Sequence, residues 1–315
     1  MSTNTIKKVL KTTLKVIAWL IAAIIIFLVA FVIWFKAEGV TVALNDEGDY
    51  RFVRFDTRVD TLKASGPYVA DTATLGMKLT IDTLRATEIR EYFQLDTLYS
   101  PNDDTWTKAL AIGKFVATNI PHDNQKEDPK YKNAIGLWEY TKTVAPAFNC
   151  RLHSILTFEL LSSVGIKARY ITCLPQDSID RDCHVVNEVW LPEKNKWVML
   201  DTDMGGHYVT DKSGNLLSLR EMREHYIAGK KMVMYPGFEK GSSRMTYYYA
   251  YMAKNTYWFT CWGNLGFYQE DYTTYPEYKL REQHYALVPS GFEPFSRRNT
   301  TAATSDEKQF WKMID

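Results

Sequence analysis

Three side chains that lie far apart in the sequence, Cys150, His184 and Asp201, are of the types that thiol catalysis requires. A thiolate attacks a carbonyl carbon, an imidazole accepts the thiol proton, and a carboxylate orients the imidazole and favours its charged form. Cys150 opens a run of apolar residues at helical spacing, and the positive end of a helix dipole favours thiolate over thiol. From position alone, a buried and inert core cysteine is an equal alternative.

A predicted hairpin brings the histidine and the carboxylate together. Strand-like runs cover residues 184–191 and 197–201, and the polar residues 192–196 connect them tightly. With the turn centred near residue 194, His184 lies opposite about residue 204, and Asp201 is a near neighbour at the open end of the hairpin. This pairing favours a catalytic triad over an inert cysteine.

The surrounding sequence predicts the elements that must hold these residues. The apolar face that starts at Cys150 ends near Gly165, which is a suitable C-terminal stop for a helix. A strand-like run follows over residues 168–174, and a turn and helix-cap cluster at residues 101–104 precedes a helix over residues 106–120. We therefore expect an α+β fold in which the cysteine-bearing helix packs on an antiparallel sheet.

The residues around the three side chains resemble the transglutaminase-like superfamily over roughly residues 105–210. The resemblance is carried in order by Asn149-Cys150-Arg151, Gly165 to Tyr170, His184 to Trp190 and Trp197 to Asp201. It implies a transglutaminase-like, papain-like core in which Cys150 is the nucleophile, His184 is the general base and acid, and Asp201 is the orienting carboxylate. Asn149 and the pair Val185-Val186 depart from the residues that are usual in the family.

Four further residues are predicted to contact the substrate: Asn149, Glu188, Gly205 and Gly206. Glu188 lies four residues past His184 on the same strand face, where it would rim the cleft, and the alternative is a solvated charge. The two glycines would let a substrate backbone approach closely, or they form only a turn.

The remaining histidines and cysteines near the triad have other interpretations. We expect His153 to be a packing residue, because a neighbour three positions after Cys150 points along the helix rather than across a cleft. Cys173 and Cys183 would form a disulfide in an oxidising compartment, or they stay free and buried. Zinc binding by Cys150, His153, Cys183 and His184 is disfavoured because their spacing fits no familiar paired-ligand pattern. We expect no metal ion and no cofactor.

The N-terminal region has the sequence of a membrane anchor. Residues 16–35 carry no charge and would span about 30 Å as a helix, which is enough to cross a bilayer. Lysines precede this run and acidic residues follow it, so the positive-inside rule places the N-terminus in the cytoplasm. A cleaved signal peptide is the alternative, but the apolar run is longer than usual and no small-residue pair closes it.

These features divide the chain into five predicted parts. They are a cytoplasmic tail (1–15), a single transmembrane helix (16–35), an extracytoplasmic N-terminal segment (36–100), a transglutaminase-like catalytic core (101–235) and an aromatic-rich C-terminal extension (236–315). The catalytic core is therefore expected in the periplasm or at the cell surface.

Composition limits the function classes. The 315 residues are 46% hydrophobic and 24% charged, which is typical of a globular protein, and the net charge of +1 gives no field that would attract nucleic acid. The expectation is a membrane-tethered thiol enzyme that acts through a thioester on amide bonds of a peptide, a protein or a cell-envelope component. Hydrolysis is slightly favoured over crosslinking because no calcium-loop pattern occurs. The alternative is a catalytically idle module that binds a peptide or cell-wall strand on the same fold.

Overall fold

A six-stranded sheet lies at the centre of the folded body, in the strand order β12-β11-β9-β4-β5-β6. The strands are β4 (Ala168–Leu174), β5 (His184–Leu191), β6 (Lys196–Leu200), β9 (Trp258–Trp262), β11 (His284–Leu287) and β12 (Thr300–Thr304). Neighbouring strands are antiparallel, except that β12 runs parallel to β11. The structure is a computed structural model that describes residues 3–37, 40–44, 50–124, 127–180, 182–203, 206–235, 245–267, 284–294 and 300–314.

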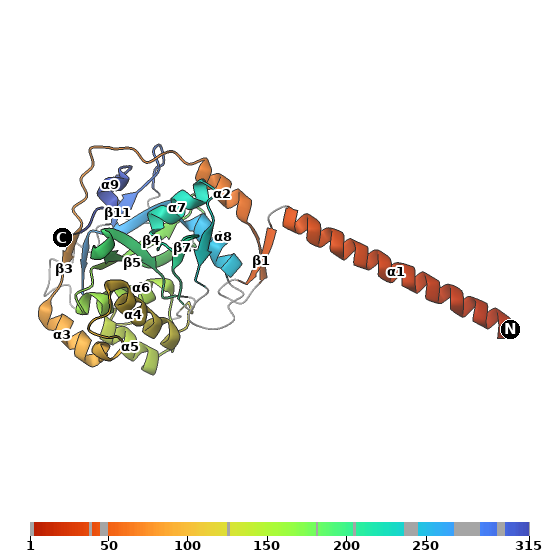
Figure 1. The fold of residues 1–315 in the computed structure, drawn as a ribbon, viewed down its shortest axis with the longest axis horizontal. Helices are drawn as coiled ribbons and strands as arrows, with labels where there is room; N and C mark the ends of the chain where they lie inside the picture. Colours follow the sequence, from red (N-terminus) through yellow and green to blue (C-terminus); the bar gives the residue numbers. More distant parts are fainter. Residues whose placement is uncertain are drawn as a thin grey trace.

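Helices cover both faces of this sheet (Figure 1). On one face lies α6 (Cys150–Ser163), which is surrounded by α3 (Thr83–Tyr92), α4 (Thr105–Asn119) and α5 (Ala134–Thr143). On the other face lie α2 (Phe55–Lys63), α7 (Leu219–Ile227) and α8 (Met245–Asn255), and α9 (Glu307–Phe310) contacts β11 and β12.

Strand β5 shows how one strand serves both layers. The Asn187 side chain donates a hydrogen bond to the Ser154 carbonyl in α6 at 2.9 Å, whereas Glu188 accepts one from the Leu219 N–H in α7 at 3.0 Å. Adjacent residues of a strand point to opposite faces of the sheet. The two helix layers are therefore fastened to consecutive residues of the same strand.

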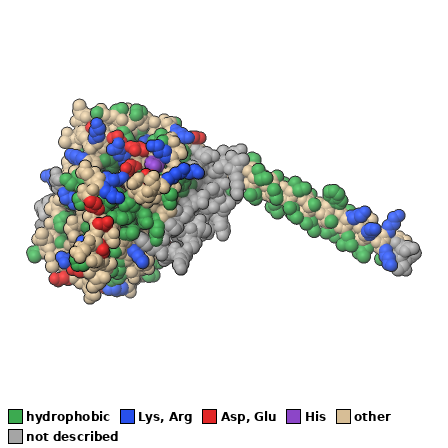
Figure 2. All heavy atoms as spheres, in the orientation of Figure 1, with side chains coloured by type: hydrophobic (Ala, Val, Ile, Leu, Met, Phe, Trp, Pro, Cys, Tyr) green, Lys and Arg blue, Asp and Glu red, His purple; other side chains and the backbone are tan. Residues whose placement is uncertain are grey.

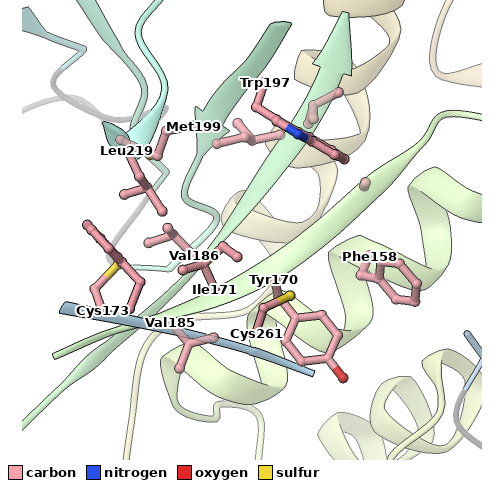
Figure 3. Close-up of a cluster of buried hydrophobic side chains, with 14 of the residues drawn as sticks. Phe158, Tyr170, Ile171, Cys173, Val185, Val186, Trp197, Met199, Leu219 and Cys261 are labelled. Atoms are coloured by element: carbon pink, nitrogen blue, oxygen red, sulfur yellow. The ribbon is translucent and has the colours of Figure 1, made fainter. Parts of the chain in front are cut away.

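Buried apolar side chains fill the space around the central strands. Figure 3 shows part of this core, with Ile171 and Cys173 from β4, Val185 and Val186 from β5, and Cys261 from β9. All five are buried. Because helices cover both faces, β4 is buried along its whole length instead of at alternate residues.

Local sequence signals set both ends of α6. Asn149 is the N-cap residue, and its side chain accepts a hydrogen bond from the Leu152 N–H at 3.3 Å. At the other end Gly165 has a φ of +79°, and the Ile166 N–H donates to the Leu161 carbonyl at 3.0 Å. This left-handed cap satisfies the last carbonyls of the helix and favours glycine. The predicted stop at Gly165 is confirmed.

The β5–β6 hairpin has a register that differs by one residue from the predicted register. The short helix η2 (Pro192–Lys194) forms the connection, and Asn187 pairs with Leu200. Continued past the end of β6, this register would place residue 203 opposite His184, where the prediction placed residue 204. The difference matters for the site below.

Three short strand pairs complete the described fold. They are β1 (Val40–Leu44) with β2 (Tyr50–Arg54), β3 (Lys78–Thr80) with β10 (Asn264–Gly266), and β7 (Val209–Asp211) with β8 (Met232–Met234). A further short helix, η1 (Leu95–Thr97), follows α3.

Helix α1 (Thr3–Ala37) projects away from the folded body (Figure 1). Residues 5–35 are long and apolar enough to cross a membrane, a criterion that a signal sequence also meets. Figure 2 shows hydrophobic side chains along this helix and the lysines gathered at its N-terminal end. The predicted span over residues 16–35 lies inside this helix.

The predicted α+β fold, with the Cys150 helix packed on antiparallel strands, is confirmed. The boundaries predicted at residues 36, 101 and 236 stay predictions. Strands β9, β11 and β12, which follow residue 236, nevertheless join the central sheet.

Candidate active site

Cys150 is the first residue of α6, directly after the cap formed by Asn149. The first N–H groups of an α-helix have no partner within the helix, and they carry the positive end of its dipole. The Cys150 side chain therefore lies where backbone donors and a favourable field are available to a negative charge. Cys150 itself is half-buried and lines a pocket of about 220 Å³.

His184 is the first residue of β5, and it joins the cysteine to the carboxylate of Asp201. Its Nε2 atom lies 2.5 Å from Asp201 Oδ2, and both side chains are buried. The Cys150 Sγ atom and a ring nitrogen of His184 lie within 4.8 Å of each other. Because Nε2 is engaged by Asp201, Nδ1 is the ring nitrogen that remains for the thiol. The order thiol, imidazole, carboxylate is that of a catalytic triad.

Asp201 is held in place from three sides. Its backbone forms an isolated bridge with His207, with hydrogen bonds of 2.9 and 2.7 Å. Its Oδ2 accepts a hydrogen bond from the Tyr248 hydroxyl of α8 at 2.8 Å, and its Oδ1 accepts one from the Asp203 N–H at 3.0 Å. The His207 ring stacks on Tyr248 at 4.1 Å. These contacts hold the Asp201 carboxylate in the orientation in which it pairs with His184.

The charges of the site favour transfer of the thiol proton to His184. Burial alone would lower the pKa of His184, but the Asp201 carboxylate outweighs it and holds this pKa well above the usual value. Burial raises the pKa of the Cys150 thiol, and the neighbouring His184 opposes that rise. The helix dipole alone is therefore not sufficient to activate the thiol. Asp201 adds to the activation because it makes His184 a stronger base.

A second carboxylate, Asp203, lies in the same site. Its oxygens are 2.8 and 2.9 Å from His122 Nδ1, and one of them is 3.5 Å from His153 Nε2. Sγ of Cys150, a ring nitrogen of His184 and an oxygen of Asp203 lie within 4.8 Å of one another. Burial would raise the pKa of Asp203, but the hydrogen bond with His122 and the neighbouring histidines lower it to about 2.

A family model of the transglutaminase-like superfamily matches residues 94–202, a region that contains Cys150, His184 and Asp201. Residues 94–202 belong to the transglutaminase-like superfamily. The match ends directly after Asp201. No curated protein matches the chain.

Solved structures that are similar to the chain include three proteins. A proposed cysteine protease from Cytophaga hutchinsonii is 17% identical, with a TM-score of 0.30, over 48% of this chain and 46% of its own. A proposed protease from Parabacteroides distasonis is 12% identical, with a TM-score of 0.24, over 42% and 30%. A transglutaminase is 14% identical, with a TM-score of 0.28, over 73% and 45%. The chain thus spans less than half of the length of each of these proteins.

The structure brings the predicted nucleophile, base and carboxylate of the transglutaminase-like core together in one place, and their catalytic roles are taken up as a proposal below. Asn149 also reaches the site: it lines the pocket and caps α6 at the same time. Gly205 lies outside the described residues. Gly206 is not among the pocket residues; it has a φ of +84° and closes a turn by donating its N–H to the Asp203 carbonyl at 2.9 Å.

The predicted position of Glu188 at the rim of the cleft is wrong. Glu188 is fully buried, its carboxylate lies 2.7 Å from the Arg169 guanidinium, and it is absent from the residues that line the pocket. The physical reason is the helix layer on that face of the sheet. Glu188 points toward α7 and accepts a hydrogen bond from the Leu219 N–H, whereas on an uncovered sheet face it would point into solvent.

His153 has the packing role that the sequence predicted. It is buried against the Phe148 ring at 4.9 Å, and burial lowers its pKa. Cys173 lies opposite His184 on β4, and all four cysteines are free thiols in the structure. The spacing among Cys150, His184 and Asp203 would admit a metal ion, and two of these groups also make hydrogen bonds, Asp203 with His122 and His184 with Asp201.

Sequence reasoning missed Asp203 and His122. The hairpin register held a signal for Asp203, because it pointed to about residue 204 as the position opposite His184, and the acidic residue next to that position is Asp203. His122 follows the end of α4 in a polar loop, and no periodic pattern links it to the triad.

Proposed function

We propose that the chain is a membrane-tethered thiol enzyme that acts on amide bonds of peptides or proteins through a thioester, with hydrolysis slightly favoured over transfer to an amine. The observation that carries the proposal is the assembly of Cys150, His184 and Asp201 at one pocket, with the cysteine at a helix N-terminus. The match to the transglutaminase-like superfamily over residues 94–202 supports it.

In the acylation step, His184 accepts the proton of the Cys150 thiol while sulfur forms a bond to the carbonyl carbon. The electron pair of the carbonyl π bond moves to oxygen, where the N–H groups at the start of α6 can donate to it. When this pair returns, the bond from carbon to nitrogen breaks, and the amine leaves with the proton from His184. Asp201 stabilises the imidazolium that exists between these events.

In the second step, water attacks the thioester carbon and gives its proton to His184. The bond from carbon to sulfur then breaks, the carboxylic acid is released, and the Cys150 thiolate takes the proton back from His184. Water is the acceptor of the acyl group that the proposal slightly favours. The sequence supports the same choice, since it carries no calcium-loop pattern of the kind expected for a calcium-dependent crosslinking enzyme.

The N-terminal helix supports a tether. Residues 5–35 are sufficient in length and apolarity to span a bilayer, and the lysines at residues 7, 8, 11 and 15 lie at the N-terminal end. Under the positive-inside rule this charge pattern supports a cytoplasmic N-terminus and an extracytoplasmic catalytic core. Peptides or proteins of the cell envelope are the substrates within reach of such a core.

The test uses the full chain in detergent micelles. The protein is incubated with a peptide library and a primary-amine donor, and the products are read by mass spectrometry beside a Cys150→Ala control. We expect Cys150-dependent hydrolysis of amide bonds. Isopeptide or amine-transfer products would overturn the preference for hydrolysis but keep the thioester chemistry.

A thiol-reactive probe separates the enzyme from a catalytically idle peptide-binding module on the same fold. The enzyme requires rapid labelling of Cys150 that depends on His184. Labelling at the rate of an ordinary buried cysteine, together with no turnover of the library, would overturn the proposed function.

A further inference from the structure

We propose that His122, held by Asp203, is a further catalytic residue of this site, and that it donates a hydrogen bond from Nε2 to the oxyanion formed when Cys150 attacks a carbonyl. This role rests on the proposed function and deepens it. The triad accounts for Cys150, His184 and Asp201, but it leaves His122 and Asp203 without a role.

The backbone places His122 beside the start of the cysteine helix. His122 forms a bridge with Phe148, and the Asp123 N–H donates to the Phe148 carbonyl at 3.2 Å. Phe148 is two residues before Cys150, so this segment runs along the end of α6 where the backbone donors lie. The His122 side chain lines the same pocket as Cys150 and His184.

Asp203 holds the imidazole ring of His122 in one orientation. Both carboxylate oxygens lie within hydrogen-bond distance of Nδ1, at 2.8 and 2.9 Å. Because the two nitrogens of an imidazole point in divergent directions, a ring held through Nδ1 presents Nε2 on its other side. Asp203 is itself fixed, since its N–H donates to Asp201 Oδ1 at 3.0 Å.

The charges of the site indicate that His122 is an imidazolium. Asp203 is fully buried, and a buried carboxylate requires a compensating charge. The groups that the structure places on it are His122 and His153, and burial lowers the pKa of His153, which favours its neutral form. Asp201 already has His184 as its partner. Asp203 is thus left with His122 as its compensating charge, and in an imidazolium both ring nitrogens are donors.

A fixed cation beside the thiol is suited to the transition state. Negative charge develops on the carbonyl oxygen during attack, and donors that are already oriented stabilise it without reorganisation. His184 cannot provide this donor, because it exchanges protons with sulfur and with the leaving group. The two histidine–aspartate pairs therefore have different roles. His184 and Asp201 transfer the proton, and His122 and Asp203 stabilise the oxyanion.

The test compares two reactions of Cys150 in the full chain in detergent micelles. Acylation by p-nitrophenyl acetate passes through an oxyanion and releases nitrophenolate, whereas alkylation by iodoacetamide is a direct displacement at carbon that forms none. We expect His122→Phe to slow acylation by about 10²–10³-fold more than it slows alkylation. His122→Gln keeps a neutral donor and is expected to recover part of the acylation rate. His225→Gln, on α7 and outside the pocket, is the matched control.

Retained alkylation also reports that the variant site is folded. Equal acylation rates in wild type and His122→Phe would overturn the proposal, and so would a parallel loss of acylation and alkylation, which would show that His122 acts on the thiol. If the wild-type chain shows no Cys150-dependent acylation, the proposed function itself fails.

Discussion

The buried ion pair of Arg169 and Glu188 gives a prediction that separates a core role of Glu188 from a role in the cleft. Arg169 donates to Glu188 at 3.1 and 2.7 Å, and the Leu219 N–H donates to the other carboxylate oxygen at 3.0 Å. Glu188→Gln removes the negative charge and leaves the guanidinium buried beside a neutral amide. Removal of one partner from a buried pair costs about 3–5 kcal/mol.

This cost predicts a large thermal shift. Each kcal/mol lowers the Tm of a body of this size by roughly 2–4 °C, so Glu188→Gln is expected to unfold roughly 6–20 °C below wild type. Burial raises the pKa of Glu188 even though Arg169 opposes the rise, which means that the pair does not fully offset its desolvation. The double variant Arg169→Met with Glu188→Leu should therefore lose less stability than the two single variants added together.

The assay is thermal unfolding of the full chain in detergent micelles, followed by circular dichroism, with KM measured where all variants are folded. The matched control is Glu224→Gln, which removes an exposed partner of Arg220 and should cost less than about 1 kcal/mol. A Tm of Glu188→Gln equal to that of the control, together with a raised KM, would refute the core role and indicate that Glu188 binds substrate.

Three further predictions follow from the site and its helix. Asp201→Asn removes the charged partner of His184, so kcat should fall by about 10³–10⁴-fold with KM little changed in steady-state assays; a change in KM alone would contradict this role. The pKa of Asp203 is about 2 in the folded chain against 3.8 ordinarily, so its contribution to stability is present above about pH 4 and is lost as the pH falls toward 2. Urea unfolding of Asp203→Asn should show a flatter pH dependence in that window, and an identical slope would count against it. Gly165→Ala should lower the stability by about 1 kcal/mol in the same assay because Gly165 has a left-handed φ. No atom lies within 4 Å of an added Cβ, so a steric clash does not contribute to this cost. An unchanged stability would contradict the role of Gly165 in the cap.

Local patterns in the sequence predicted much of the element order. Strand β4 and helix α4 occur where apolar runs and polar connections indicated them, and α6 ends at its glycine. These elements are set by signals within about ten residues of each other, such as caps, turns and periodicity. The triad followed from the same signals, because a short hairpin brings His184 and Asp201 together without any long-range information.

The errors arose where distant segments meet. Nothing in the sequence of β5 shows that α7 packs over Glu188. The sequence therefore predicted an exposed Glu188 at the rim of the cleft, whereas the residue is buried under α7. Its partner Arg169 pairs with it across β4 and β5, whose nine-residue connection over residues 175–183 is too long to set a register. Similarly, His122 reaches Asp203 only because the loop after α4 returns to the start of α6.

The hydroxyl of Tyr248 on Asp201 has a practical consequence for anyone who trims this chain. Tyr248 lies on α8, 46 residues beyond the end of the family match at residue 202, and β9, which borders β4, lies further still. A fragment limited to residues 94–202 would retain all three triad residues. It would lack the Tyr248 hydroxyl that donates to Asp201, and it would lack β9, which pairs with β4. A minimal active version should therefore be sought by removing elements one at a time from the C-terminus and testing each shortened chain.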